Sequence, residues 1–262
     1  YPLTISNNGN SGLNIISSGT SNAGQINFGD ADDADIGRIR YDHSDNTMKF
    51  VTNTATALSI AADGSLSTPT SGTSNVRFGV NAGNSIVSGA QYNTVVGDEA
   101  GTAITTGDEN TFVGYTAGDA TTTASGNTAL GFSALTTNVL GSKSVAIGRA
   151  ALQVQNPASA TDMYNVAIGH GAGEAITTGF NNTAVGGLAL DIQTTGDYNV
   201  ALGTLALSAD TTGNKATGLG YGALAAQNVT DSADTFNTAV GFSAGSSITT
   251  GIQNTIIGAS AG

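Results

Sequence analysis

Four aspartates lie within six residues of one another, at Asp30, Asp32, Asp33 and Asp35. Carboxylate oxygens are the ligands that Ca²⁺ prefers, and a Ca²⁺ site takes about six to eight oxygens. The four carboxylates could gather a Ca²⁺ ion, although the order of ligands found in an EF-hand is absent. We interpret the segment as a solvated acidic loop and keep a Ca²⁺ site as the alternative.

The remaining titratable residues do not form a catalytic pattern. The histidines His43 and His170 are far apart, and neither has the partners that a zinc site or a catalytic triad requires. Glycosidases need two carboxyl groups roughly 5–10 Å apart across a cleft. Glu99, Glu109 and Glu174 stand at variable positions, with no evident aromatic groove for a sugar. We therefore predict that the protein is not an enzyme and holds no cofactor.

The glycines of this chain belong to a repeated motif rather than to a GxGxxG or GKS/T phosphate loop. The nine residues NTAVGGLAL, from Asn182 to Leu190, exemplify the motif. When the places of each copy are numbered from its first residue, place one is usually Asn, place five is Gly, place eight is Ala, and place nine is Gly or Leu. The eleven copies begin at Asn75, Asn93, Asn110, Asn127, Ser144, Asn165, Asn182, Asn199, Ala216, Asn237 and Asn254.

The spacing of the copies is itself repeated. From Asn93 the starts advance by 17, 17, 17 and 21 residues to Asn165, and the same steps lead from Asn165 to Asn237. Four copies therefore form a super-repeat of 72 residues, with Lys143 and Lys215 at equivalent points. Such an order predicts a structure that grows by stacking similar units.

A period of 17 residues is too short for helical repeats, which need about 33 residues or more. Glycine and β-branched residues also disfavour a helix. In NTAVG, places two and four share one face of a strand, and places one, three and five share the other. Glycines at places five and fifteen suit sharp corners. We predict an all-β fold over residues 75–262, a parallel β-solenoid or β-roll whose coils have two short strands each and stack about 4.8 Å apart.

One large side chain fills the interior of each coil from one of two places. Gly173 at place nine accompanies Ile176 at place twelve, whereas Leu190 at place nine accompanies Gln193 at place twelve. Gly118 and its coil break this rule. Compensation of this kind is expected when both places fill the same volume.

The predicted interior is thin. Each coil offers about two large aliphatic residues, worth roughly 2 kcal/mol each when buried, while ordering each residue costs on the order of 1–2 kcal/mol for the backbone alone. The alanines at places three and eight suggest close approach by another chain. We therefore predict an obligate homo-oligomer.

Two sequence patterns resemble known families. SVAIG (144–148) and NVAIG (165–169) resemble the head repeats of trimeric autotransporter adhesins, which form a left-handed parallel β-roll trimer. NTAVGFSAG (237–245), spaced by TTG, is similar to repeats in the tail fibres of tailed bacteriophages. The resemblance covers about 75–262 and implies a homotrimer.

Residues 1–74 lack the repeat and are predicted to form a separate region of short strands and hairpins. The alternating runs are 3–6, 12–17, 25–28, 38–41, 48–51 and 57–60, with a hairpin turn at 42–46. The run from INFGDADD to TMKFVTN, followed by LSIAADGSL, resembles segments found upstream of fibre repeats in phage tail proteins. This second resemblance favours a phage origin.

The four extra residues of the longer copies lie within Gln153–Met163 and Ala225–Thr235. Insertions on a solenoid form loops on one face, often the binding face. We favour tolerated bulges without a ligand and keep receptor contact as the alternative. Tyr92, Tyr164 and Phe236 precede the blocks and are predicted to cap a corner of the roll. The candidate receptor-contact residues are Asn156, Pro157, Asp162, Asn228, Asp231 and Asp234.

The composition limits the partners. A net charge of −12, with 7 basic against 19 acidic residues, argues against nucleic-acid binding. The chain has no cysteine, which excludes a disulfide framework. It also has no apolar run long enough for a transmembrane helix, so we predict no membrane insertion.

Three functions remain. The leading hypothesis is a structural fibre protein of a phage tail: a rigid homotrimeric shaft in the virion that contacts other tail proteins and presents loops to a host glycan or protein. The second is a trimeric adhesin on a bacterial cell surface. The third is an ice-binding β-solenoid, prompted by the many threonines, although NTAVG gives Thr-x-aliphatic rather than Thr-x-Thr on one face.

Overall fold

The computed structural model describes residues 15, 19, 21–32, 34, 36–68 and 71–262. The chain divides into two compact units, Tyr1–Pro69 and Thr70–Gly262. All regular elements of the described residues are β-strands, so the all-β prediction is confirmed. None of the described residues belongs to a helix that could cross a lipid bilayer.

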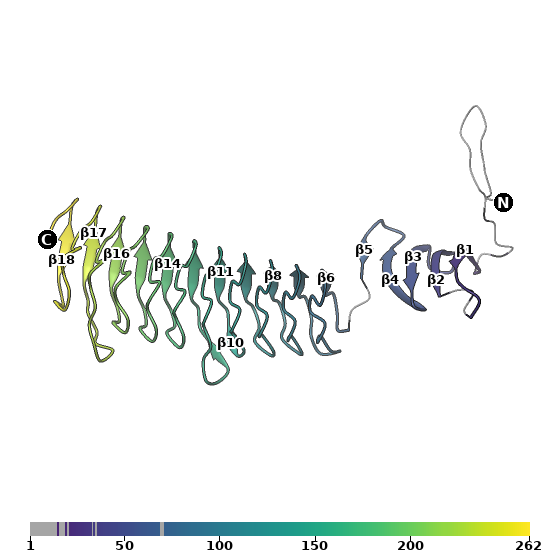
Figure 1. Cartoon of the computed structure of the whole chain (residues 1–262), viewed down its shortest axis with the longest axis horizontal. Coiled ribbons are helices and arrows are strands. Elements are labelled where there is room, and N and C mark those ends of the chain that lie inside the picture. The colour runs from purple at the N-terminus through teal and green to yellow at the C-terminus, as the bar shows by residue number, and fades with distance from the viewer. Residues whose placement is uncertain (1–14, 16–18, 20, 33, 35, 69–70) are drawn as a thin grey trace, which may run out of the picture. The chain divides into compact units, whose positions relative to one another are not determined.

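The first unit contains a five-stranded antiparallel sheet, in which neighbouring strands follow one another along the chain. The predicted hairpin is confirmed, because β2 and β3 pair around a turn that holds Asn46 in the left-handed conformation. The predicted strands at 3–6 and 12–17 lie outside the described residues, apart from Ile15. The strands are β1 (Ala23–Phe28), β2 (Gly37–Asp42), β3 (Thr47–Thr52), β4 (Ala55–Ile60) and β5 (Leu66–Ser67) (Figure 1).

The second unit is a parallel β-solenoid, as predicted, with one strand of an eleven-stranded sheet in each coil (Figure 1). Places two to four form the strand, and equal places align, as in the pairing of Thr183 with Val200. The longer copies keep this register, since Val145 pairs with Val166. The strands are β6 (Val76–Phe78), β7 (Thr94–Val96), β8 (Thr111–Val113), β9 (Thr128–Leu130), β11 (Val145–Ile147), β13 (Val166–Ile168), β14 (Thr183–Val185), β15 (Val200–Leu202), β16 (Thr217–Leu219), β17 (Thr238–Val240) and β18 (Thr255–Ile257).

The prediction of two strands in every coil is wrong. The described part of the solenoid has a second strand pair only at β10 (Gly141–Ser142) and β12 (Thr161–Asp162). Elsewhere, places five to twelve form turns that donate hydrogen bonds to neighbouring coils. Places five, seven and nine are left-handed, as at Gly97, Glu99 and Gly101, with φ of 133°, 57° and 52°. Left-handed residues at every second position cannot form an extended strand.

The two glycine corners are confirmed, and each has its own cause. At place five, Gly186 has φ of 132°, a conformation open almost only to glycine. A Cβ on Gly186 would also lie 2.6 Å from the carbonyl carbon of Gly203 in the next coil. At place fifteen the coils again approach closely, and a Cβ on Gly179 would collide with the carbonyl oxygen of Gly196.

The narrow interior of each coil belongs to a single chain. The alanines of place eight are buried from Ala82 to Ala244, and those of place three are buried as well. Small side chains therefore allow two walls of one coil to meet. The interpretation that they admit a second chain is wrong.

The compensation between places nine and twelve is confirmed. Leu190 and Ile176 are both fully buried, each supplying the large side chain of its own coil. The exception at Gly118 has a steric explanation, because a Cβ there would collide with the ring of Phe112. Phe112, at place three of the same coil, is fully buried and fills the volume that Leu or Ile fills elsewhere.

Most coils bury fewer large aliphatic residues than the two predicted. The place-four residues lie on the outer face of the sheet, where Leu130 exposes 45% and Leu202 exposes 51% of its surface. Alternation along the strand requires this, because places one and three already face the interior. The single chain therefore leaves the large place-four residues outside its own core.

The place-one asparagines form a buried ladder that runs between coils. Asn182 Nδ2 donates to the carbonyl oxygen of Gly196 at 2.8 Å, and Asn182 Oδ1 accepts the N–H of Asn199 at 2.9 Å. The same two bonds are repeated at Asn93 and Asn110. A buried backbone group without a partner is costly. The ladder satisfies such groups at the entry to each strand.

Candidate functional site

The outer face of the eleven-stranded sheet is apolar along its length. We call it the apolar sheet face, and it consists of places two and four of the eleven strands. Place two is Thr or Val, place four is Val, Leu, Ile or Phe, and neither place carries a charge. Leu202 and Ile257 expose 51% and 73% of their surfaces. Contiguous apolar patches of this kind mark contact surfaces.

A row of aromatic and basic residues borders this face, just beyond the glycine of place five. We call it the place-six strip, and it consists of Tyr115, Phe132, Arg149 and His170 from successive coils. The rings of Tyr115 and Phe132 stack with centroids 5.4 Å apart. The guanidinium of Arg149 lies 5.6 Å from the centroid of Phe132, and Arg149 Nη1 is 3.2 Å from His170 Nε2. All four side chains are exposed.

A second row borders the other edge of the face, at the residue before place one. Tyr92, Tyr164 and Phe236, the predicted corner residues, lie here with left-handed backbones and expose 57%, 50% and 51% of their surfaces. Lys143 Nζ lies 5.3 Å from the ring centroid of Tyr164, and Lys215 Nζ lies 5.2 Å from that of Phe236. Aromatic residues thus flank the apolar sheet face on both sides.

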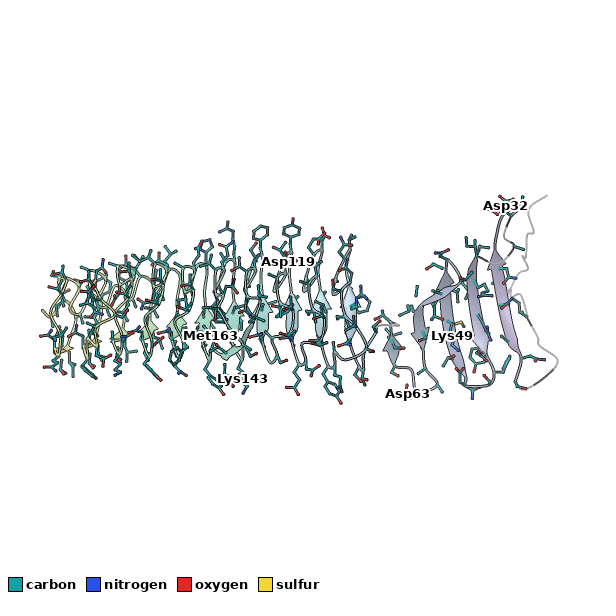
Figure 2. The ribbon with its side chains drawn as sticks, turned by 90° about the horizontal axis from the view of Figure 1, so that it is seen from below. Asp32, Lys49, Asp63, Asp119, Lys143 and Met163 are labelled. Carbon is teal, nitrogen blue, oxygen red and sulfur yellow. The ribbon has the colours of Figure 1, made fainter. Side chains whose placement is uncertain are left out.

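Ion pairs hold the longer copies against the preceding coil. Lys143, which is labelled in Figure 2, has its Nζ 2.6 Å from Asp162 Oδ2. Lys215 Nζ likewise lies 2.6 Å from Asp234 Oδ2. The hydrogen bond from Lys143 lowers the pKa of Asp162, and the same bond raises the pKa of Lys143. Both pairs are exposed, so solvent screens them and each contributes little to the stability of the fold.

The longer copies also supply a carboxamide where the asparagine ladder lacks one. Place one is Ser144 or Ala216 in these copies, and neither supplies a carboxamide. Gln155 Oε1 accepts from Asn165 Nδ2 at 2.9 Å, and Gln227 Oε1 accepts from Asn237 Nδ2 at 2.7 Å. Both glutamines are fully buried at place twelve. These copies therefore have a structural role inside the coil.

The six candidate receptor-contact residues differ in their exposure and in their contacts. Asp162 and Asp234 are exposed but are engaged by the two lysines described above. Pro157 is buried, which leaves little of it for a receptor. The structure brings Asn228 Oδ1 within 3.0 Å of the Thr211 hydroxyl, which donates to it.

The other two candidates differ in their contacts. Asn156 is exposed, and its Oδ1 accepts weakly from the Val139 N–H at 3.4 Å. Asp231 is exposed on a left-handed backbone with φ of 67°. The six candidates come from two copies four coils apart, and no contact joins the two sets among the described residues. Receptor contact by these loops stays a prediction.

The calcium candidate is only partly visible. Asp33 and Asp35 lie outside the described residues, whereas Asp30 and Asp32 are exposed. Asp30 Oδ1 accepts the N–H of Asp32 at 2.9 Å. Among the described residues, no three or more His, Cys, Asp or Glu side chains are grouped as metal ligands. The calcium site therefore stays a prediction.

The candidate catalytic residues are dispersed in the described structure. The ring of His43 meets Tyr41 edge-on in the first unit, at a centroid distance of 4.9 Å. His170 belongs to the place-six strip, and Glu99 Oε1 accepts from Asn81 Nδ2 at 2.7 Å.

One carboxyl group lies inside the solenoid. Asp210 is buried at place twelve, where its Oδ1 accepts the Gly213 N–H at 2.9 Å and its Oδ2 accepts from Gln227 Nε2 at 2.6 Å. Burial raises the pKa of Asp210, and these hydrogen bonds offset the effect in part. Burial likewise raises the pKa of Asp119, which is labelled in Figure 2, and of Asp191.

Sequence reasoning missed the row that Tyr115, Phe132, Arg149 and His170 form at place six. The available signal was their shared place in successive copies, which parallel stacking turns into adjacency. The chain matches no protein-family model, no curated protein and no solved structure.

Proposed function

We propose that the protein is a structural fibre component of a phage tail, in which the solenoid forms part of a rigid homotrimeric shaft. The observation that supports this proposal is the apolar sheet face, which is uncharged and is partly or largely exposed in one chain. Burying such a face stabilises an assembly by roughly 25 cal/mol per Å² of apolar surface. The core of a single chain is thin, so it contributes little other free energy to the stability of the fold.

The occupant of the face is a second and a third copy of this chain. Its side chains recur at the rise of one coil, about 4.8 Å. A partner that matches them over eleven strands must have the same rise, and another copy in parallel alignment has it. Three copies are preferred because the NVAIG and NTAVG motifs resemble those of trimeric β-rolls.

The 72-residue super-repeat then sets where loops are presented. Lys143–Asp162 and Lys215–Asp234 hold two equivalent loops four coils apart, about 19 Å along the solenoid. In the proposed shaft these loops project from the virion tail towards a host glycan or protein. The role of the protein is mechanical support and attachment, without catalysis.

The same trimeric roll would also serve a bacterial surface adhesin, which is the alternative location. An ice-binding role is less well supported. A row of threonines lies outside the sheet, at place thirteen of several copies. Their hydroxyls donate to the next coil, as from Thr194 Oγ1 to the Thr211 carbonyl oxygen at 2.8 Å. Those groups are therefore not free to order water. Thermal hysteresis in a solution of the protein would favour the ice-binding role over the shaft.

Sedimentation equilibrium of the purified chain tests the assembly. A mass of three chains is expected, and a folded monomer at micromolar concentration would refute the shaft. Leu202→Glu places a charge on the apolar sheet face and should dissociate the trimer, while the free chain still tolerates it because Leu202 is half exposed. Thr195→Glu, at an exposed position outside the sheet, is the matched control and should sediment as a trimer.

A further inference from the structure

The place-six strip differs from the rest of the solenoid surface in its charge. The second unit has four lysines and arginines. Arg77 donates to the Ala82 carbonyl, and Lys143 and Lys215 pair with aspartates. Arg149 instead contacts the rings of Phe132 and His170. Among the described residues, Arg149 is exposed and has no carboxylate within ion-pair distance. In a chain of net charge −12, an exposed arginine without a carboxylate partner is a place where an acidic ligand is not repelled.

The neighbours of Arg149 hold its guanidinium in a fixed position. Phe132 lies beneath it at 5.6 Å, and Tyr115 supports Phe132 by stacking. A guanidinium over an aromatic ring is attracted to the ring and keeps its in-plane N–H groups available. The N–H groups can therefore grip a carboxylate with two parallel hydrogen bonds.

We infer that the place-six strip binds an acidic saccharide, with Arg149 holding a sugar carboxylate. The sugar rings lie along Phe132 and Tyr115, whose carbon surfaces suit their C–H groups, and the Tyr115 hydroxyl and His170 exchange hydrogen bonds with sugar hydroxyls. Four coils span roughly 14 Å, which accommodates a short linear oligosaccharide. The inference rests on the proposed attachment function and names the ligand class for it.

The solenoid contains its own control for this site. Tyr221 and Phe242 occupy place six in later coils and stack with centroids 5.2 Å apart. Their neighbours at place six are Thr204 and Ala259, so the pair lacks a cation. If exposed stacked aromatics alone bound the ligand, both pairs would bind. If the arginine is required, only the pair beside Arg149 binds.

The test is calorimetric titration of the full chain with trigalacturonate, with its neutral methyl ester and with hexaglutamate. We expect binding of trigalacturonate alone. Arg149→Gln should weaken binding at least tenfold, and Phe132→Leu should weaken it several-fold. Phe242→Leu should bind as the wild type does. Thermal melts of each variant show whether a loss of binding reflects a loss of folding, and Arg149→Lys, which keeps the charge, should recover only part of the affinity.

The opposite results overturn the inference. They are no binding by the wild type, equal binding of the ester or of hexaglutamate, or equal weakening by Phe242→Leu and Phe132→Leu. Sedimentation separates this question from the shaft. A trimer that ignores trigalacturonate refutes the saccharide site and leaves the shaft standing, whereas a monomer that binds it does the reverse.

Discussion

At the scale of single residues, Asp210 occupies a place that Asn138 fills in an equivalent coil. Both side chains accept the N–H of a place-fifteen glycine, at 2.9 Å for Asp210 and 3.0 Å for Asn138. Both also accept from a buried glutamine, Gln227 or Gln155. Of the two side chains, only Asp210 can ionise, so only Asp210 can place a charge at this buried position. The chain thus provides a neutral substitute for its own buried acid.

Asp210→Asn should stabilise the protein at pH 7. Burial raises the pKa of Asp210, so the folded state binds the proton more tightly than the unfolded state does. The wild type therefore loses stability as pH rises from the unfolded pKa of about 3.9 through the folded value, and it regains that stability on acidification. The melting temperature of Asp210→Asn should exceed that of the wild type by a few degrees at pH 7, and the two should converge near pH 4.

The reciprocal change gives the control. Asn138→Asp should lower the melting temperature at pH 7 and have no effect near pH 4. An Asp210→Asn variant that is less stable than the wild type at pH 7 would show that the hydrogen bonds to the charged carboxylate outweigh its burial.

Leu190→Gly tests whether places nine and twelve fill one volume. Leu190 is fully buried, and its removal should cost about 2–4 kcal/mol of unfolding free energy. Adding Gln193→Ile recreates the Gly–Ile pair of Gly173 and Ile176 and should recover most of the loss. The change also removes the Gln193 Oε1 atom, which has no hydrogen-bond partner in the described structure. Urea unfolding of the single and double variants measures the coupling, and additive effects would contradict a shared volume.

At the scale of elements, the asparagine ladder keeps coils of different length in register. Gln227 enters the ladder where Ala216 lacks a carboxamide, and so it links a longer copy to the next coil. The four additional residues then stay outside the sheet, and β16 and β17 pair as the other strands do. The length of a copy and the order of the sheet are therefore separable.

Gln227→Ala should destabilise the solenoid by about 2–3 kcal/mol, because it removes one of the two acceptors of the buried Asn237 Nδ2 group and the side-chain donor to Asp210 Oδ2. Gln153→Ala is the control, since only the backbone carbonyl of Gln153 accepts a hydrogen bond, from Thr137. Chemical denaturation compares the two variants. Equal midpoints for both would show that the ladder tolerates a gap.

The solenoid could be predicted from the sequence because the period of 17 residues and the glycine corners follow directly from backbone geometry. The second strand could not be excluded, because left-handed backbones at residues such as Glu99 and Leu190 have no clear sequence signal. The sequence also did not show which face of each strand points into the coil. Ala and Asn suit a close contact between chains as well as the interior of one narrow coil, and only the structure places them in the latter.

The candidate site divides in the same way. The loops with Asn156 and Asn228 could be located from spacing alone, but the burial of Gln155 beneath one loop depends on how the coils stack. The row from Tyr115 to Arg149 joins residues of three coils, and its contacts exist only once equal places become neighbours.

At the scale of the whole molecule, the proposed trimer should make thermal stability depend on concentration. Association stabilises the folded state by mass action, so the melting temperature should rise with protein concentration. Leu202→Glu should remove this dependence, whereas Thr195→Glu should keep it. Differential scanning calorimetry over a hundredfold range of concentration measures both, and a constant melting temperature for the wild type would contradict the trimer.

Because the eleven strands share one register, every coil adds the same length to the solenoid. Its extent is set by a count of coils, so duplication or loss of a 17-codon segment would change it in steps of about 4.8 Å. Removal of residues 165–236 would join Tyr164 to Asn237, a junction like that of Phe236 with Asn237. Recombination between equivalent positions of the repeats in the gene can therefore change the length of the solenoid, and the core residues of each coil stay the same.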